Sequence, residues 1–328
     1  MNQPNEEPSQ LDDTARIAPG PEADVVLDGS AGDLAAADAP PVAKWRGRLL
    51  ILLAVVMWSS SGLFVKSGFF DDWPTVSRGP LLAFWRSFFA ALVLLPVVRR
   101  PRWEVRLVPL AIIFAVMCLV YMTALVLTSA ASAIWLQATA PWWVFLFSLL
   151  LLREGVNRRD LFTLIPAAVG VAIILGHELV GQAWVGMLAG LASGATFGGV
   201  LMLMRKLSGH DGAWLVALCH GSAAVALLPW MLVIGIYPSP WQLVVLAGFG
   251  AIQMGIPYVF LVRGLRTVPS QEAALIALAE PVLMPLWVFL VGQETPSWWI
   301  VVGAGCIFTG LVLRYVWVER MVARRSSR

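Results

Sequence analysis

Long apolar segments follow one another from residue 49 to residue 318, separated by short breaks that carry charges, Pro or Gly. A helix needs about 20 apolar residues to cross a bilayer, and each segment is close to that length. The breaks predict ten membrane-spanning helices, near 49–68, 80–98, 107–127, 130–152, 160–176, 183–204, 213–235, 241–262, 270–291 and 297–318. The predicted fold is therefore an all-α integral membrane protein.

Landmark residues recur 140 positions apart and relate one half of the chain to the other. The matched pairs are Pro141 with Pro281, Glu154 with Glu294, and Gly170 with Gly310. Five helices per half is an odd number, so the second half would insert in the opposite orientation to the first. We therefore expect two inverted five-helix repeats, residues 44–176 and 177–320, an architecture typical of secondary transporters.

Composition favours the bilayer as the solvent of this chain. Hydrophobic residues make up 59% of the sequence and charged residues 13%, whereas a soluble domain has about 25% charged residues. Residues 1–43 differ, because they hold nine acidic residues, one basic residue and no aromatic residue. We predict that residues 1–43 form a disordered acidic tail and residues 321–328 a basic C-terminal tail.

The basic residues predict how the chain is oriented. In the ten-helix arrangement, 19 of the 23 Lys and Arg residues fall on one side of the membrane. Cytoplasmic loops carry an excess of such residues. We therefore expect a multi-pass protein of the cytoplasmic (inner) membrane with both termini in the cytoplasm.

An ordered set of short motifs resembles the drug/metabolite transporter superfamily, in its ten-span branch with EamA-type repeats. The motifs are Trp58-Ser59-Ser60 with Lys66, Phe84-Trp85-Arg86-Ser87-Phe88, and the segments 132–154 and 273–294. The resemblance covers about residues 49–318. It implies a carrier of small organic metabolites, such as an exporter of amino acids or related compounds, or a carrier of vitamins, sugars or drugs.

Charged residues at membrane depth are costly and mark candidate transport paths. Glu280 is predicted near mid-depth beside Pro281, where it would bind substrate or a proton, or else pair with a neighbouring helix. Arg86 would hold a substrate carboxylate, neutralise Glu280, or extend to the outer interface. Pro141 and Pro281 are expected to kink their helices at the site. Lys66 is expected to extend to the outer interface.

Other polar and aromatic residues are predicted to line the path, although packing roles also fit them. They are Trp58, Ser60, Tyr121, Gln137, His220, Gln253 and Tyr258. His220 would relay protons or pack as a hydrogen-bonded core residue. A stripe at four-residue spacing, formed by Gly186, Gly190, Gly194 and Gly198, is expected to let another helix approach closely.

The predicted function is secondary transport by alternating access, with export favoured. An importer of a vitamin or other solute and a drug efflux carrier remain alternatives, and so does a non-transporting membrane sensor or assembly protein. The chain has no phosphate loop and no His-Glu-x-x-His pair, so we predict no enzyme, cofactor or metal. Expected partners are a small-molecule substrate, the lipid bilayer and protons as candidate coupling ions, without nucleic acid. Monomer and homodimer both stay open.

Overall fold

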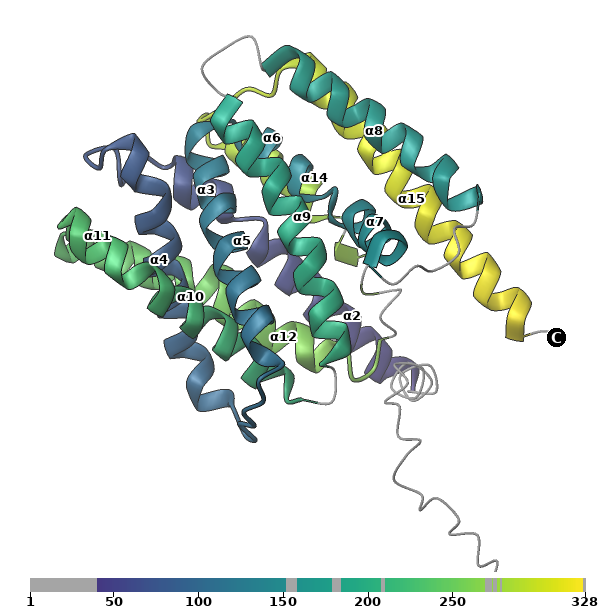
Figure 1. Ribbon diagram of the computed structural model, residues 1–328, viewed down its shortest axis with the longest axis horizontal. Helices are drawn as coiled ribbons and strands as arrows, with labels where there is room; N and C mark the ends of the chain where they lie inside the picture. The colour runs from purple at the N-terminus through teal and green to yellow at the C-terminus, as the bar shows by residue number, and fades with distance from the viewer. Residues whose placement is uncertain are drawn as a thin grey trace, which may run out of the picture.

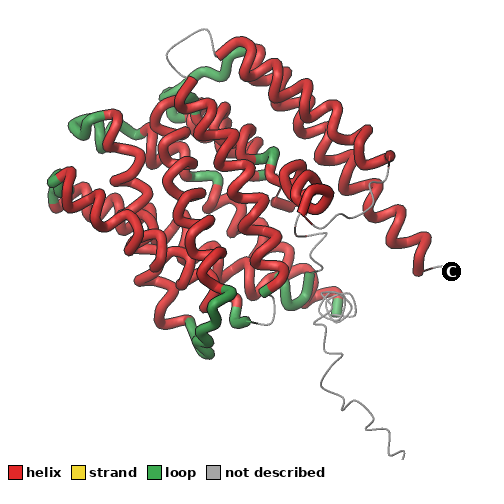
Figure 2. The backbone as a smooth tube through the Cα atoms, viewed as in Figure 1, coloured by secondary structure: helices red, strands yellow, loops and turns green. Residues whose placement is uncertain are grey.

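The computed structural model describes residues 40–151, 158–178, 184–207, 210–268, 273, 276–277 and 279–326. Figure 2 shows that these residues form helices joined by loops and turns. The elements labelled in Figure 1 and used below are α2 (Pro41–Trp58), α3 (Ser61–Lys66), α4 (Thr75–Leu94), α5 (Leu107–Leu127), α6 (Ala130–Gln137), α7 (Ala140–Leu151), α8 (Arg158–Glu178), α9 (Trp184–Lys206), α10 (Gly212–Ile234), α11 (Pro240–Gly248), α12 (Ile256–Gly264), α14 (Glu280–Leu290) and α15 (Trp298–Ser326). Two short segments complete them, the 3₁₀ turn η1 (Leu95–Val97) and the π-helical η2 (Phe249–Gly255).

Some predictions fall on residues that the structure does not describe. These are most of the 1–43 tail, Glu154 and residues 327–328. At the N-terminal side α2 begins at Pro41. At the other end α15 continues to Ser326, so the described part of segment 321–328 is helical.

Six helical segments are long and apolar enough to cross a membrane, counted within the described residues. Three shorter apolar helices accompany them, over Ile165–His177, Glu280–Leu290 and Trp298–Gly310. Aliphatic side chains also cover the outer surface of the bundle, such as Val233, which is 86% exposed, and Val225, which is 70% exposed. A bundle that is apolar both inside and outside suits a lipid environment.

The third predicted span agrees with the structure at both ends. α5 spans Leu107–Leu127 as predicted, between Arg106 and Thr128. Three predicted spans differ, because each is interrupted. The first breaks at Ser59–Ser60, the fourth breaks at Ala138–Thr139, and the eighth contains η2. No charged residue lies at any of the three interruptions, so the pattern of charges gave no boundary there.

The helix limits repeat at the same distance as the landmark residues. α4 ends at Leu94 and α10 at Ile234, α7 begins at Ala140 and α14 at Glu280, and α8 begins at Arg158 and α15 at Trp298. Each pair is 140 residues apart. Pro141 and Pro281 therefore occupy the same place, in the first turn of a new helix. A proline fits there because that position has no intrahelical N–H bond to lose. Each proline thus lies just after a helix begins, and Pro141 directly follows the interruption of the fourth span.

Counterpart helices of the two halves run in opposite directions and pack against each other. α8 and α15 lie side by side in Figure 1. His177, at the end of α8, stacks on Trp299, at the start of α15, with ring centroids 5.1 Å apart. Farther along, a Cβ on Gly303 would lie 2.8 Å from the carbonyl oxygen of Gly170. α4 and α10 also pack together, and the amide of Arg99 just after α4 donates to Asp211 just before α10, at 3.1 Å.

The glycine stripe of α9 packs against the interrupted fourth span. A Cβ on Gly190 would lie 2.9 Å from Leu136 Cδ1, and one on Gly194 would lie 2.6 Å from the Leu136 carbonyl oxygen. A Cβ on Gly198 would lie 3.0 Å from the carbonyl oxygen of Ala140. The stripe therefore follows α6, the break and the start of α7. The expected close approach is confirmed, and the neighbour is the broken helix.

Candidate functional site

Helix interruptions bring backbone polar groups into the middle of the bundle. α2 ends at Trp58 and α3 begins at Ser61, and the π-helical η2 packs against both α2 and α4. Irregular backbone at membrane depth is tolerated where protein surrounds it or where it lines a cavity. π-helical segments are rare and often mark functional sites. These interruptions define the region in which we place the candidate site.

Arg86 lies at the centre of this region, on α4, and its side chain is 0% exposed. Its Nη1 donates to Oε1 of Gln253 at 3.2 Å, and its Nη2 lies 3.7 Å from the Sγ of Cys118. Nε has no hydrogen-bond partner within the described residues. No ion pair to Arg86 is found there either. A guanidinium has five N–H donors, so this cation uses few of them.

Aromatic rings flank the guanidinium on two sides. Its central carbon lies 5.8 Å from the ring centre of Tyr121 and 5.7 Å from that of Phe249. These distances are within the range of cation–π attraction, which offsets part of the cost of burying the charge. The alternative in which Arg86 extends to the outer interface is wrong, because the residue is 0% exposed.

Gln253 connects Arg86 to the break in the first span. Its Oε1 accepts from Arg86, and its Nε2 donates to the carbonyl oxygen of Trp58 at 3.2 Å. Trp58 is the last residue of α2, where the helical hydrogen-bond pattern ends. The amide of Gln253 therefore links a buried cation to the carbonyl group at the end of a helix.

Glu280 faces the same region from the other half of the chain. It is the first residue of α14 and is partly buried. Its charge acts on Arg86, Tyr121 and Tyr258. Among the described residues, Glu280 and Arg86 do not form a direct ion pair. An acid and a base from opposite repeats thus lie near each other across a zone that also contains two phenols.

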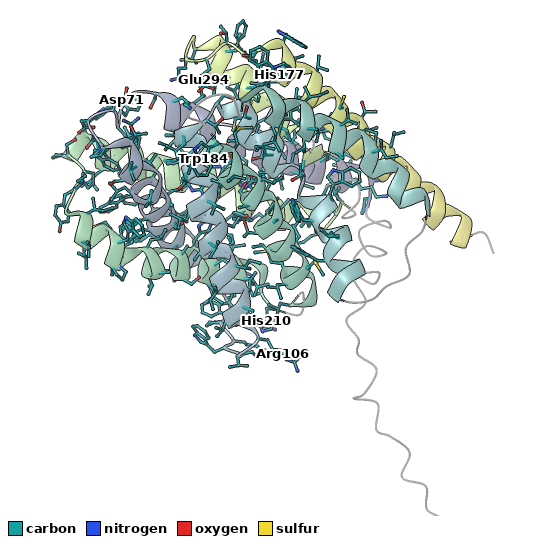
Figure 3. All side chains as sticks on the ribbon, turned by 45° about the horizontal axis from the view of Figure 1, so that its top comes forward. Asp71, Arg106, His177, Trp184, His210 and Glu294 are labelled. Carbon is teal, nitrogen blue, oxygen red and sulfur yellow. The ribbon has the colours of Figure 1, made fainter. Side chains whose placement is uncertain are left out.

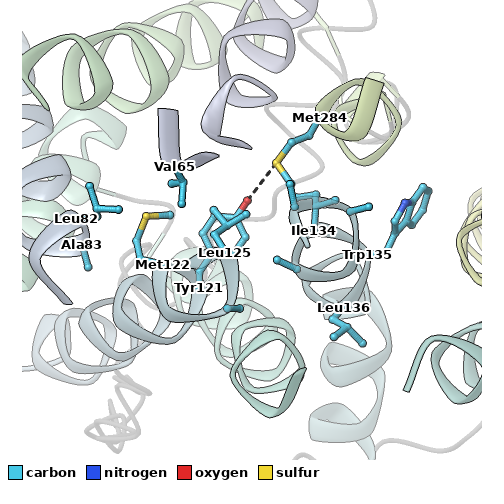
Figure 4. Close-up of a cluster of buried hydrophobic side chains, with 14 of the residues drawn as sticks. Val65, Leu82, Ala83, Tyr121, Met122, Leu125, Ile134, Trp135, Leu136 and Met284 are labelled. Atoms are coloured by element: carbon cyan, nitrogen blue, oxygen red, sulfur yellow. Dashed lines mark hydrogen bonds between the residues drawn. The ribbon is translucent and has the colours of Figure 1, made fainter. Parts of the chain in front are cut away.

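A hydroxyl–sulfur cluster joins α3, α5 and α14 beside the arginine. The hydroxyl oxygens of Ser61 and Tyr121 are 3.3 Å apart, and Ser61 Oγ lies 3.0 Å from the Sδ of Met284. Figure 4 shows the Tyr121 hydroxyl directed at the same sulfur, at 3.7 Å. Nearby, Trp287 donates its indole N–H to Ser59 Oγ at 2.8 Å. Two neighbours of Ser60 thus make the contacts between helices.

Ser60 itself bonds locally. Its hydroxyl donates to the carbonyl oxygen of Met57 at 2.6 Å, within the same interrupted helix. The structure therefore assigns Ser60 to the helix break rather than to contacts with other helices.

His220 and Tyr258 extend the cluster towards α10. The ring of His220 is 0% exposed and lies edge-on to Phe114, with centroids 4.9 Å apart. Tyr258 lies 6.1 Å from His220 and 5.1 Å from Trp58, measured between ring centroids. Neither ring nitrogen of His220 has a hydrogen-bond partner in the described part of the chain. The alternative of a hydrogen-bonded core histidine is therefore not what the structure shows.

Gln137 lies at a different interruption. It is the last residue of α6, and its carbonyl oxygen approaches Gly194 on α9. Across the described residues, no hydrogen bond or ring contact joins Gln137 to the cluster around Arg86. Pro141 follows in the first turn of α7. Gln137 and Gln253, both predicted to line the path, therefore share no contacts among the described residues.

An apolar pocket of about 280 Å³ lies apart from Arg86, between α6, α14 and α15. Its walls include Trp135, Pro281, Pro285 and Phe308. Pro281 therefore faces this pocket. The polar cluster around Arg86 is closed, so a ligand would reach it only after the helices move.

Lys66 and Glu294 form a second contact between the halves, at one end of the bundle. Lys66 Nζ lies 2.8 Å from Glu294 Oε1 and donates to the carbonyl oxygen of Thr128 at 2.7 Å. Glu294 Oε2 accepts from the amide of Ala130 at 2.8 Å. Our expectation that Lys66 extends to the membrane interface is therefore wrong, since it pairs within the protein.

Sequence reasoning missed several residues of the site. Ser61 continues the serine run after Trp58, and Met284 lies one helical turn beyond Glu280, so both had a detectable signal. Cys118 and Phe249 had none, because each lies within a uniformly apolar segment. Their contacts with Arg86 depend on the packing of α5 and η2 against α4.

Comparisons with known proteins show the family and the fold. The model of the EamA-like transporter family matches the chain twice, over residues 45–176 and 184–316. An uncharacterized transporter of Archaeoglobus fulgidus is 26% identical over 272 residues, which cover 82% of this chain and 96% of that protein. A protein of known crystal structure shares the fold with a TM-score of 0.56 and 19% identity, over 81% of this chain and 96% of that one. The two family matches together span most of the sequence, and we conclude that this membrane transporter belongs to the EamA-like transporter family.

Proposed function

We propose that the protein is a secondary transporter that exports small organic metabolites, such as amino acids or related compounds, by alternating access. The chain would cross the cytoplasmic membrane ten times. In this arrangement, α6 with α7, α8, the segment that ends in α14, and α15 add four spans to the six long ones. The two repeats would move relative to each other around a site between them.

The observation that carries this proposal is the buried contact from Arg86 through Gln253 to the Trp58 carbonyl. It joins α4, the π-helical η2 and the end of α2, and Glu280 of α14 acts on it electrostatically. Charged and polar groups of this kind are expensive in a bilayer unless they serve a path or a site. Interrupted helices supply the backbone groups that such sites use in transporters.

Each predicted path residue receives a role in this proposal. Arg86 and Glu280 form the charged centre, and Gln253 positions the guanidinium. Trp58, Tyr121 and Tyr258 supply walls that match apolar parts of a substrate. The remaining predicted residues, Ser60, Gln137 and His220, lie at helix breaks or beside these walls, and they would act through movement or packing.

The charge distribution supports a membrane orientation with both termini in the cytoplasm. Figure 3 shows Asp71, His177 and Glu294 at one end of the bundle and Arg106 and His210 at the opposite end. The end with Arg106 also has the arginine-rich stretch Arg99–Arg106. The excess of basic residues at this end would keep it in the cytoplasm.

Export is tested by comparing secreted metabolites. Cells that lack the protein and cells that produce it would be grown in parallel, and organic solutes in their media would be measured. We expect at least one solute to increase outside the producing cells.

Radiolabelled samples of that solute would then be followed into inside-out vesicles, with Thr309→Ala as a control variant. Thr309 bonds its own helix and is exposed on α15, so transport should be unchanged. The proposal would be overturned if the two media contained the same concentrations of organic solutes and the vesicles took up none.

A further inference from the structure

Arg86 is a buried cation with unused hydrogen-bonding capacity. The guanidinium makes one hydrogen bond to an amide oxygen and one long contact to a sulfur. Its Nε lies in the interior without a partner among the described residues. A buried donor that is left unsatisfied is costly, and a buried charge is more so. The arrangement is thus incomplete unless an acceptor joins it.

We propose that Arg86 binds the carboxylate of a monocarboxylate substrate through the edge formed by its Nε and Nη donors. This inference rests on the proposed transport function and deepens it by naming the substrate class. Planar guanidinium groups bind carboxylates through two parallel N–H···O bonds, and the Nε–Nη edge offers such a pair. Nε is the donor without a partner in the closed state, so it is the free half of this pair.

Two observations define the rest of the substrate. The aromatic rings of Tyr121 and Phe249 flank the guanidinium, which favours an aromatic or branched aliphatic body next to the carboxylate. Glu280 faces the same zone from the other half of the chain, and it would repel a second carboxylate when it is ionised. A second carboxylate on the substrate would meet that charge, so dicarboxylates are disfavoured.

The alternative role for Arg86 is to neutralise Glu280 permanently. A structural pair of that kind would place the two groups in direct contact, because burial of unpaired charges is costly. The structure instead directs Nη1 of Arg86 at Gln253, and no ion pair joins Arg86 to Glu280 among the described residues. On the edge formed by Nε and Nη2, a carboxylate would replace only the long contact of 3.7 Å between Nη2 and the Cys118 sulfur. The site therefore exchanges ligands at low cost.

Binding is tested with the purified full-length protein in lipid nanodiscs, by thermal unfolding in the presence of matched compounds. The probes are 3-phenylpropionate and 4-methylpentanoate, the amide of each, and the dicarboxylate phenylsuccinate. The amides control for partitioning into lipid, since they share the apolar body. We expect both monocarboxylates to raise the unfolding temperature, and we expect the amides and phenylsuccinate to leave it unchanged.

Three substitutions then assign the binding to Arg86. Arg86→Gln should weaken monocarboxylate binding by about tenfold to a hundredfold, the loss expected for a charge-assisted pair. Arg86→Lys should not restore it, because an ammonium group lacks the planar edge. Gln253→Glu should also prevent binding, since a carboxylate 3.2 Å from Nη1 would occupy the guanidinium. Arg78→Gln is the matched control. Arg78 lies in the first turn of α4 and pairs with Asp71 in the preceding loop.

The outcomes separate this inference from the proposed function. Monocarboxylates that bind no better than their amides to the unsubstituted protein would overturn the inference, and that result does not depend on whether a variant folds. Equal binding by Arg86→Gln would overturn it as well. If the protein moves an organic solute in vesicles yet fails this binding test, transport stands and the substrate class is wrong. If monocarboxylates bind through Arg86 and no solute crosses, the proposed function fails.

Discussion

Lys66 Nζ lies 2.8 Å from Glu294 Oε1, and the two side chains together hold the turn between α5 and α6. Lys66 binds the carbonyl oxygen of Thr128 on one side of the turn, and Glu294 binds the amide of Ala130 on the other. The first repeat supplies the lysine and the turn, and the second supplies the glutamate. This end of the bundle is thus closed by a contact that joins the halves.

Lys66→Met and Glu294→Gln should each destabilise the closed conformation. The side chains are 18% and 25% exposed, so the pair is screened less than a surface pair. We expect a coupling free energy of about 1–2 kcal/mol between the two positions in a double-mutant cycle of unfolding in mixed micelles. Additive effects of the two substitutions would show that the ion pair contributes nothing to stability.

Glu280→Gln should impair coupled transport and leave membrane insertion intact. The substitution keeps the shape of the side chain and removes its ionisable group. The electrostatic interaction with Arg86 is therefore lost. Proton-coupled uptake of the exported solute into vesicles would be measured between about pH 5 and pH 8, a range in which buried acids and histidines titrate. Tyr121, Tyr258 and Arg86 interact with Glu280, and His220 packs on Tyr258. A variant that transports at the parental rate throughout this range would exclude coupling through Glu280.

Gly194→Ala should destabilise the protein through the broken fourth span. The added Cβ would lie 2.6 Å from the carbonyl oxygen of Leu136, and a backbone atom cannot move aside as a flexible side chain does. We expect a loss of about 1–3 kcal/mol in the free energy of unfolding. Gly305→Ala is the control, because a Cβ at this exposed helical position meets no atom within 4 Å. Alanine there should be neutral or stabilising by about 1 kcal/mol. Equal stability of the two variants would contradict the close packing of α9.

His220→Phe should preserve folding and leave the unfolding temperature equal or higher. The ring of His220 is buried against Phe114, and its nitrogens have no partner among the described residues. A phenyl ring would keep the edge-on contact and remove two polar atoms that are costly to bury. Thermal unfolding and vesicle transport would be compared with those of the parent. A marked loss of stability would indicate that the imidazole is hydrogen-bonded in the working protein.

The sequence predicts the apolar helices because charged or small polar residues mark the ends of most apolar runs. α5 is bounded by Arg106 and Thr128, and its predicted limits agree with the structure. The repeat distance also follows from the sequence, since proline fits the first turn of a helix in both halves. The breaks at Ser59–Ser60 and Ala138–Thr139 are different. Both lie inside apolar runs, and only tertiary packing decides where those helices stop.

The sequence predicted some residues of the candidate site but none of their contacts. Arg86 and Glu280 are recognisable as charged residues at membrane depth, where each is costly. Their neighbours are distant in the sequence, so the links from Arg86 to Gln253 and from Lys66 to Glu294 require the fold. Cys118 and Phe249 show the same limit, since apolar residues in an apolar helix do not reveal which of them face a cation.

The packing of two helices on their own counterparts has a consequence for the origin of the chain. α4 meets α10 and α8 meets α15, so equivalent surfaces of the two halves face each other in antiparallel fashion. A single half-length ancestor inserted in both orientations would find those same surfaces on a second copy of itself. Fusion of two such genes would then preserve interfaces that had already evolved between separate subunits.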